Sequence, residues 1–155
     1  MTVRKAETAD IPHLMRLLHQ VLDVHHQGRP DLFRGGVTKY TEDELAALLA
    51  DERTPVFVAD NGETVCGYAF CVMQQHVGHN IFTDVATLYI DDLCVDEQCR
   101  GRHIGQTLYE YVLDYARAAK CYNVTLNVWA CNESALRFYE AQGLTPQKIG
   151  MERIL

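Results

Sequence analysis

The sequence lacks a long apolar run and has no surplus of positive charge. No stretch approaches the roughly 18 apolar residues of a membrane span, and the first ten residues, MTVRKAETAD, lack the apolar core of a signal peptide. The 155 residues carry a formal net charge of -7. Non-specific nucleic-acid binding needs a basic face that neutralises phosphates, which this charge argues against. We therefore expect a cytoplasmic protein that binds neither nucleic acid nor a membrane.

Closely spaced cysteine pairs are also missing, so the six cysteines do not show the pattern of a zinc site. Without a secretion signal they are interpreted as reduced thiols, mostly in the core. His25, His26, His76 and His79 repeat no tight ligand pattern, and we expect no metal. No repeat, low-complexity tract or linker divides the chain. Its length and 48% hydrophobic content predict a single domain over residues 1–155.

Hydrophobic periodicity predicts a mixture of strands and helices. The expected strands are VRKA, PVFVAD and ETVCGYAFCVMQQ around an Asn61–Gly62 turn, VATLYIDDLCV, VTLNVWA and a last strand in QKIGMERIL. The expected helices run from Thr8 or Asp10 to about Val24, through TEDELAALLAD with its Thr41 and Glu44 capping box, from Ile104 to about Lys120, and through NESALRFYEAQ. HHQGRPDLFRGG is expected to be irregular. Hairpins mixed with strand–helix–strand crossovers predict an α/β fold, a mixed sheet with helices on both faces.

Positive charge and glycine gather in QCRGRHIGQTL, residues 98–108, between an apolar strand and an amphipathic helix. The first amides of a helix have no internal partner, and the helix dipole places about half a positive charge there. Gly101 and Gly105 keep side chains away from the backbone. Positive charge is added by three neighbours, Arg100, Arg102 and His103. The segment therefore predicts a pyrophosphate site, and the alternative is an ordinary loop with solvated arginines.

Other phosphate motifs fit less well, because the chain has no Gly-Lys-Ser/Thr and its glycine spacing differs from the dinucleotide fingerprint. QCRGRHIG instead resembles the acyl-CoA pyrophosphate motif of the GNAT superfamily of N-acetyltransferases. Gln98 and Gly101 match that motif, whereas His103 stands where Gly or Ala is usual. NVWACNESALRFYEAQGL resembles the second CoA-contacting segment of the family, in which an Asn begins a helix with an FY pair. Both matches lie within residues 88–144, and the first 75 residues match only in layout.

The resemblance implies the GNAT fold with acetyl-CoA as cosubstrate. Two parallel strands, TLYIDDLCV and VTLNVW, would splay apart and hold the pantetheine arm against the backbone of Leu93, Cys94 and Val95. The pyrophosphate would lie against seven consecutive residues, Arg100, Gly101, Arg102, His103, Ile104, Gly105 and Gln106. Asn132 would be a helix cap, a CoA contact or both.

Acetyl transfer to an amine needs a neutral nitrogen, a stabilised oxyanion and a proton for the departing thiolate. The resemblance implies that Tyr139, which also counts among the CoA contacts, protonates the CoA sulfur. Helical spacing places Asn132, Leu136 and Tyr139 on one face. The alternative is that Tyr139 is a buried aromatic residue like Phe138.

Asp91 and Asp92 lie inside an otherwise apolar strand, where a buried charge costs several kcal/mol unless it is paired or solvated. Strand alternation sends the two side chains to opposite faces, so at least one should face the cleft. IDDLCV also resembles a stretch of diamine acetyltransferases, which implies Asp91 as the base and Asp92 as a substrate or structural partner. The alternative is that both carboxylates cap backbone groups or pair with an arginine.

The segment VHHQGRPDLF follows the first helix, where the family usually places acceptor-binding residues, so four side chains are candidates for an acceptor pocket: His25, His26, Arg29 and Asp31. Trp129 and Tyr89 are expected in the core. Cys94 and Cys131 show no activating neighbour, so no covalent cysteine intermediate is expected.

Together these features predict an acetyl-CoA-dependent N-acetyltransferase in which the amine attacks the thioester directly in a ternary complex. The expected acceptor is a small primary amine, polyamine or lysine-like. The alternatives are a protein or peptide acetyltransferase and a non-catalytic acyl-CoA-binding module. The resemblance and the expected C-terminal strand also suggest a homodimer.

Overall fold

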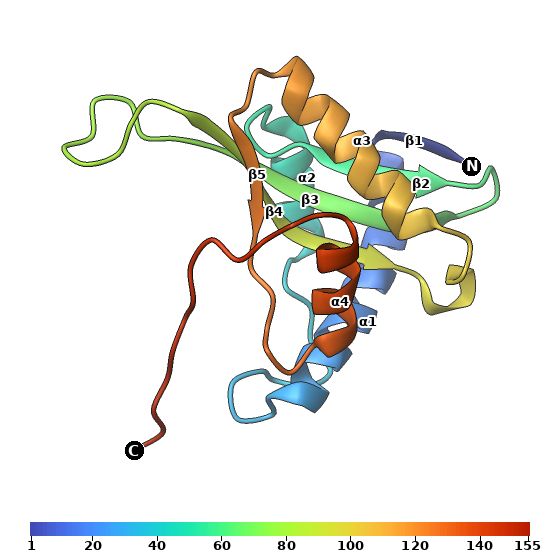
Figure 1. The fold of residues 1–155 in the computed structure, drawn as a ribbon. Helices are drawn as coiled ribbons and strands as arrows, with labels where there is room; N and C mark the ends of the chain where they lie inside the picture. The colour runs from blue at the N-terminus through green and yellow to red at the C-terminus, as the bar shows by residue number, and fades with distance from the viewer.

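The computed structural model describes all residues, 1–155. One five-stranded sheet has the order β1-β2-β3-β4-β5 (Figure 1). The strands are β1 (Thr2–Lys5), β2 (Val56–Asp60), β3 (Val65–Gln75), β4 (Ala86–Val95) and β5 (Asn123–Leu126). The first four strands pair antiparallel, and β4 pairs with β5 in parallel. The prediction of a mixed α/β sheet is confirmed.

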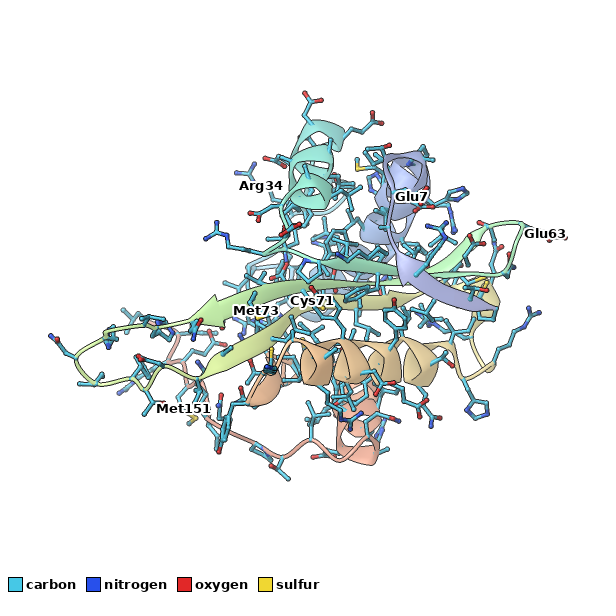
Figure 2. All side chains as sticks on the ribbon, turned by 90° about the horizontal axis from the view of Figure 1, so that it is seen from above. Glu7, Arg34, Glu63, Cys71, Met73 and Met151 are labelled. Atoms are coloured by element: carbon cyan, nitrogen blue, oxygen red, sulfur yellow. The ribbon has the colours of Figure 1, made fainter.

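Helices cover both faces of the sheet, with α1 and α2 on one side and α3 and α4 on the other (Figure 2). The helices are α1 (Ile11–Gly28), α2 (Glu42–Ala50), α3 (Ile104–Ala118) and α4 (Glu133–Ala141), with 3-10 turns η1 (Thr8–Asp10) and η2 (Glu97–Cys99). None of the helices combines the length and apolarity that crossing a bilayer requires.

Two hydrophobic clusters, one on each face, hold the layers together. Along β2, Phe57 and Ala59 belong to the cluster under α3, whereas Val56 and Val58 belong to the cluster under α1 and α2. This alternation follows from the pleat of the strand. Because both faces are covered, the strand reads as a continuous apolar run rather than an alternating one.

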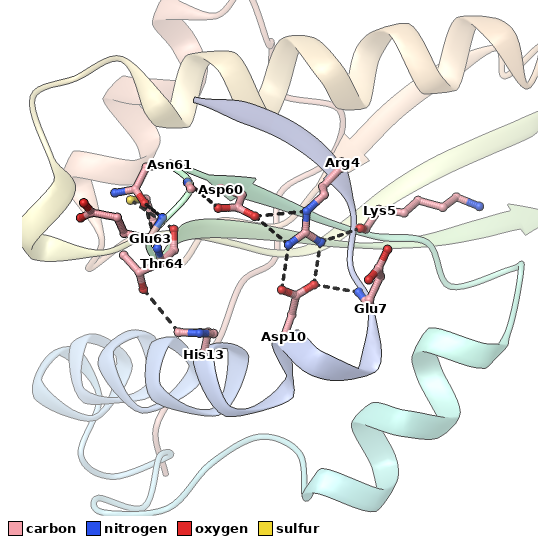
Figure 3. Close-up of polar contacts among 11 residues, drawn as sticks. Arg4, Lys5, Glu7, Asp10, His13, Asp60, Asn61, Glu63 and Thr64 are labelled. Atoms are coloured by element: carbon pink, nitrogen blue, oxygen red, sulfur yellow. Dashed lines mark hydrogen bonds and ion pairs between the residues drawn. The ribbon is translucent and has the colours of Figure 1, made fainter.

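A polar network fixes the start of α1 to the sheet (Figure 3). The Arg4 guanidinium on β1 donates to Asp10 at 2.8 Å and to Asp60, at the end of β2, also at 2.8 Å. Asp10 is buried and also accepts the Glu7 amide at 2.8 Å. The bond to Arg4 is the main cause of the lowered pKa of Asp10. The network ties α1 to two strands through one buried carboxylate.

Helix α1 continues past its expected end at Val24 and stops at Gly28, so part of the segment expected to be irregular is helical. Its last turn carries His25 and His26, and the Arg29 amide donates to the His25 carbonyl at 2.9 Å. A side chain at position 28 would place its Cβ 2.7 Å from the Cys131 sulfur. Glycine therefore lets the end of α1 approach the loop that precedes α4.

The expected C-terminal strand does not form within the chain. Residues 144–155 have no regular secondary structure and leave the body as an extended segment (Figure 1). No backbone group of residues 145–155 takes part in a backbone–backbone hydrogen bond. A strand needs a neighbouring edge to pair with, and the path of this segment brings it to none.

Candidate active site

Strand β4 carries a bulge at the two aspartates. Phe70 on β3 pairs with Asp92 and Cys71 pairs with Ile90, so Asp91 is an extra residue without a partner. A bulge shifts the alternation of side chains by one residue. Asp91 and Asp92 consequently both face the side covered by α1 and α2, where they bond to Tyr40 and Tyr68. The expectation that they face opposite sides was wrong, because it assumed a regular strand.

Asp92 is half-buried, and the groups around it shield its carboxylate from much of the solvent. Its carboxylate accepts the Tyr68 hydroxyl at 2.7 Å. Desolvation is the main cause that raises the pKa of Asp92 to about 6, against the opposing effect of the Tyr68 bond. A carboxylate with this pKa is ionised at neutral pH and is still basic enough to accept a proton from a bound substrate at that pH.

Asp91 has two partners of its own. Its carboxylate accepts the Lys39 ammonium at 2.6 Å and the Tyr40 hydroxyl at 3.0 Å. From the sequence, one alternative was that the aspartates pair with an arginine. In the structure Asp91 does pair with a cation, but this cation is Lys39. Neither Lys39 nor Tyr40 was identified from the sequence, because no local pattern links residues 39–40 with a strand some fifty positions later.

Tyr139 comes from α4 on the opposite face. Burial first, and then the negative charge of Asp92, raise the pKa of Tyr139 above its usual value. The hydroxyl therefore keeps its proton at neutral pH, as a proton donor requires. Asn132 caps the same helix by accepting the Ala135 amide at 3.3 Å, so the capping role of Asn132 is confirmed.

The strands β4 and β5 separate beside the bulge. Their pairing runs from Thr87 with Asn123 to Ile90 with Leu126 and then stops. Beyond this point the outer edge of β4, residues 91–95, has no strand beside it.

Backbone alternation decides which groups face this gap. The Asp96 amide donates to the Cys66 carbonyl on β3 at 2.8 Å. In an antiparallel pair the direction of the backbone amides alternates from one residue to the next. The Cys94 amide therefore also points toward β3, whereas the amides of Leu93 and Val95 point into the gap. Two of the three backbone positions expected along a pantetheine arm thus have the required direction. Cys94 instead buries its thiol, which lies 3.8 Å from the Leu17 carbonyl.

The loop before α3 gathers exposed positive groups around unpaired amides. Asp96 anchors it by accepting the Gln98 amide at 3.0 Å and pairing with Arg16. Gly101 has a φ of +78°, and His103, which precedes the first turn of α3, has a φ of +57°. No side chain caps that turn. Free amides and the positive helix end suit an anion.

The rest of the segment expected at the pyrophosphate, residues 100–106, is divided between solvent and core. Arg100, Arg102 and His103 are exposed, whereas Ile104 is buried. A Cβ at Gly105 would lie 3.3 Å from the Phe138 ring and 3.5 Å from Val95. Gly105 therefore allows α3 and α4 to pack closely, a role that sequence reasoning did not give it.

Gln106, the last residue of that segment, is exposed and donates to Glu110 at 2.9 Å along α3.

The four candidate acceptor residues lie together at the end of α1. His26 bonds to the Phe33 carbonyl at 2.7 Å, and His25 stacks on the Phe33 ring at 5.1 Å between centroids. Burial, followed by the charge of Lys39, lowers the pKa of His25. Arg29 pairs with Asp31 at 2.8 Å and with Glu152 of the C-terminal segment. These residues thus organise the loop after α1.

Trp129 packs its edge on Phe33 at 5.2 Å but is exposed, which corrects the expectation that it lies in the core. Tyr89 is half-buried, and its hydroxyl accepts a hydrogen bond from the side-chain Nδ2 of Asn127 at 3.2 Å. His76 and His79 lie at the tip of the β3–β4 hairpin, with ring centroids 5.7 Å apart. No group of three or more His, Cys, Asp or Glu side chains is placed to hold a metal ion.

Comparisons with known proteins agree with this geometry. Residues 20–144 match the model of the acetyltransferase (GNAT) family. Glucosamine 6-phosphate N-acetyltransferase of Arabidopsis thaliana is 25% identical over 117 residues, which cover 76% of this chain and 69% of the relative. The relative from Oryza sativa subsp. japonica is 29% identical, and the match covers 70% of this chain and 62% of that protein.

Solved structures show the same fold. The tetramutant of the BH1408 protein from Bacillus halodurans superposes with a TM-score of 0.95 and 33% identity, over 100% of both chains. An aminoglycoside N-acetyltransferase, AAC(6')-Iy, in complex with CoA superposes with a TM-score of 0.73 and 13% identity, over 99% of this chain and 98% of that one. The family match covers most of the chain, so this protein belongs to the GNAT family of acetyltransferases.

Proposed function

We propose that this acetyltransferase transfers the acetyl group of acetyl-CoA to the primary amine of a small cationic molecule, by direct attack in a ternary complex. The observation that carries the proposal is that Asp92, a carboxylate with a raised pKa just past the last β4–β5 pair, acts electrostatically on the protonated phenol of Tyr139. Together they supply the proton acceptor and the proton donor that the reaction needs.

Asp92 is the proposed base. The resemblance to diamine acetyltransferases favoured Asp91, but Asp91 is already engaged by the Lys39 ammonium and the Tyr40 hydroxyl. Asp92 has no cation bonded to it, accepts the neutral Tyr68 hydroxyl and has a pKa near 6. A proton leaving the ammonium of the acceptor passes to Asp92, directly or through water. In this proposal Asp91 and Lys39 shape the acceptor site.

Tyr139 is the proposed acid. The neutral amine attacks the thioester carbonyl carbon, the carbon–sulfur bond breaks, and the departing thiolate takes the Tyr139 proton. Burial raises the pKa of the Cys94 thiol to about 12, so this cysteine is a poor nucleophile near the gap. That supports direct transfer without an acetyl-cysteine intermediate.

The proposed cosubstrate site combines the gap beside β4 with the loop before α3. The pantetheine arm would bond to the outward backbone of Leu93 and Val95. The diphosphate would lie at the first turn of α3, near Gly101, Arg102 and His103.

Charge near the aspartates supports a cationic acceptor. A depression of about 430 Å³ begins at the Asp91 partners and is lined by Lys39, Tyr40, Glu44, Ala47, Leu48 and Asp51. In this proposal the carboxylates of Glu44 and Asp51 hold a second ammonium of a polyamine. An amino sugar is the second candidate, because glucosamine 6-phosphate N-acetyltransferases are among the relatives.

The proposal also includes the compartment. All six cysteines are free thiols, and four of them are buried, which fits the reducing cytoplasm.

The test is a thiol-release assay with acetyl-CoA and a panel of diamines, lysine derivatives, amino sugars and peptides. Release of free CoA that is fastest with diamines supports the proposal. Release that is fastest with amino sugars favours the second candidate acceptor instead. A preference for peptides points to a protein acetyltransferase. If no amine in the panel causes release of CoA while CoA still binds, the protein is a non-catalytic acyl-CoA-binding module, and the proposal is contradicted.

A further inference from the structure

Lys39 places a primary ammonium beside the two aspartates of the candidate active site. Its Nζ donates to Asp91 at 2.6 Å. The Lys39 charge also acts on Asp92, where it opposes the larger effect of desolvation on the pKa. The Lys39 side chain keeps 42% of its surface exposed. A half-exposed ammonium on these carboxylates occupies the position that the proposed function gives to the ammonium of the acceptor.

The other lysines of the chain lack such surroundings. They are Lys5, Lys120 and Lys148, which are all exposed. Lys148 belongs to the extended C-terminal tail, residues 145–155. Only Lys39 forms an ion pair with a carboxylate. The three other lysines therefore serve as internal controls for the chemical reactivity of an exposed lysine toward acetyl-CoA.

Tyr40 holds the backbone next to Lys39 against the sheet. Its hydroxyl donates to Asp91 at 3.0 Å, and its ring packs on Phe70 of β3 with the centroids 5.7 Å apart. The loop that contains both residues, 29–41, has no regular secondary structure. The flexible four-carbon stem of the lysine can therefore turn its nitrogen away from Asp91 while Tyr40 keeps the backbone at the site.

We propose that Lys39 is a self-acetylation site, which the protein modifies when acetyl-CoA is bound and no acceptor is present. The inference rests on the proposed function, because it uses the same base and acid. The Lys39 ammonium passes a proton to Asp92, and the neutral nitrogen attacks the thioester carbonyl carbon. The carbon–sulfur bond then breaks, and the departing thiolate takes the Tyr139 proton. The products are Nε-acetyl-lysine, the CoA thiol and one proton, which Asp92 releases to water.

The modification changes the charge of the acceptor site. An acetylated lysine is neutral, so Asp91 loses its cation and retains the Tyr40 hydroxyl. The carboxylate is then available to the ammonium of a diamine, which in the unmodified protein competes with Lys39. Acetylation of Lys39 should therefore lower the KM for a diamine several-fold and leave the Kd for CoA unchanged.

The test incubates the purified full-length protein with acetyl-CoA alone and follows each lysine by peptide mass mapping. We expect Lys39 to be acetylated at least about 10²-fold faster than the other three lysines, the lower end of what a positioned acid or base contributes. The rate per chain should not depend on the protein concentration, as transfer within one protein molecule requires. Equal rates for all four lysines would overturn the proposal.

Tyr139→Phe separates enzymatic transfer from chemical acetylation. This variant keeps Lys39 and its ion pair with Asp91 but lacks the proton donor, so Lys39 should react as slowly as the other lysines. A circular dichroism spectrum equal to that of the wild type shows that the variant is folded. Fast acetylation of Lys39 in this variant would overturn the proposed transfer.

Steady-state kinetics with a short aliphatic diamine test the consequence for the acceptor site. The acetylated protein should have a lower KM than the unmodified protein. Lys39→Gln, which also removes the charge, should lower the KM more than Lys39→Arg, which keeps it. An unchanged KM after acetylation would overturn the competition at Asp91.

Failure of this inference is distinguishable from failure of the proposed function. If a free amine causes release of CoA while Lys39 stays unmodified, the self-acetylation is wrong and the proposed function stands. If no amine causes release and Lys39 also stays unmodified, both are wrong.

Discussion

At the scale of single residues, the site depends on two groups whose pKa values are moved by their surroundings. Desolvation brings the pKa of Asp92 to about 6, and burial together with that carboxylate raises the pKa of Tyr139. The bulge at Asp91 turns Asp92 toward Tyr68 and so sets the surroundings of that carboxylate, whereas the shift of Tyr139 comes first from its own burial. Neighbouring groups pushed apart in pKa are a frequent sign of paired acid and base roles.

Replacing Tyr139 by Phe should lower kcat by about 10²–10⁴-fold, the usual range for a lost proton donor. The ring remains and the CoA contacts are kept, so the Kd for CoA should stay within about twofold. Steady-state kinetics and calorimetry measure the two quantities. An unaltered kcat would remove Tyr139 from the acid role.

Asp92→Asn should stabilise the protein at pH 8. The folded-state pKa of Asp92 is raised above its usual value of 3.8 to about 6, so the wild-type side chain favours the folded state at low pH. That contribution is lost as the pH rises through the folded-state pKa. Because the side chain is partly accessible, we expect a gain of about 1–2 kcal/mol at pH 8 and little gain at pH 4. Urea unfolding at both pH values checks this, and an equal effect at both contradicts the raised pKa.

At the scale of secondary-structure elements, much of the chain was predictable because its signals are local. The Thr41 and Glu44 capping box forms as expected, with the Glu44 amide donating to Thr41 at 3.2 Å and the Thr41 amide donating back at 2.8 Å. The hairpin around Asn61 also forms, although its loop is longer than the two-residue turn expected and β3 begins only at Val65. Local patterns determine such features.

The bulge in β4 and the contacts of its two aspartates were not predictable in the same way. A bulge depends on the pairing of β4 with β3, and the Asp91–Lys39 pair joins residues that only the fold brings together. The location of the four candidate acceptor residues at the end of α1 was predictable, because helical periodicity indicated where that helix lies. Of their partners, Phe33 is the last residue of the same segment but was not named as a candidate, and Glu152 lies more than a hundred residues later.

The junction of β1, β2 and α1 offers a test of stability at this scale. Arg4→Met leaves Asp10 buried without its guanidinium, which should cost about 3 kcal/mol at pH 7. Since the pKa of folded Asp10 is lowered, the contribution of the pair is present above the pKa of the unfolded carboxyl and is lost as the pH falls through the folded-state pKa. The cost should therefore be smaller at pH 3.

The matched control is Arg53→Met, because Arg53 pairs with Asp51 on the surface at 3.6 Å. An exposed pair contributes about 0–1 kcal/mol, so this variant should remain near wild-type stability. Equal losses for Arg4→Met and Arg53→Met in urea unfolding would refute the role of the buried network.

At the scale of the whole molecule, the sheet and its two helical layers bury the apolar residues of the body, while the hairpin tip and the tail leave theirs exposed. The tail, residues 145–155, includes QKIGMERIL, which was expected to form a last strand, and that expectation was wrong. Sequence reasoning from one chain assumes that a strand pairs within that chain, and here the tail finds no such edge.

Thiol labelling of the native protein tests the layering of the molecule. Cys131 is exposed, whereas burial raises the pKa of Cys66 to about 11 and of Cys71 to about 12. A thiol reagent at pH 8 should therefore modify Cys131 first and reach the buried cysteines only after unfolding. Peptide mass mapping after brief labelling measures the order, and early modification of Cys71 would contradict the described core.

The most direct test of the central claim is the pH dependence of kcat/KM for the wild type and for Asp92→Asn with the best acceptor amine. In the wild type we expect activity to rise through a pKa near 6 and to rise again as the amine itself loses its proton. In Asp92→Asn the limb near pH 6 should disappear and activity should fall by at least about 10²-fold. Retention of that limb at near wild-type activity would show that another group accepts the proton and would contradict the account.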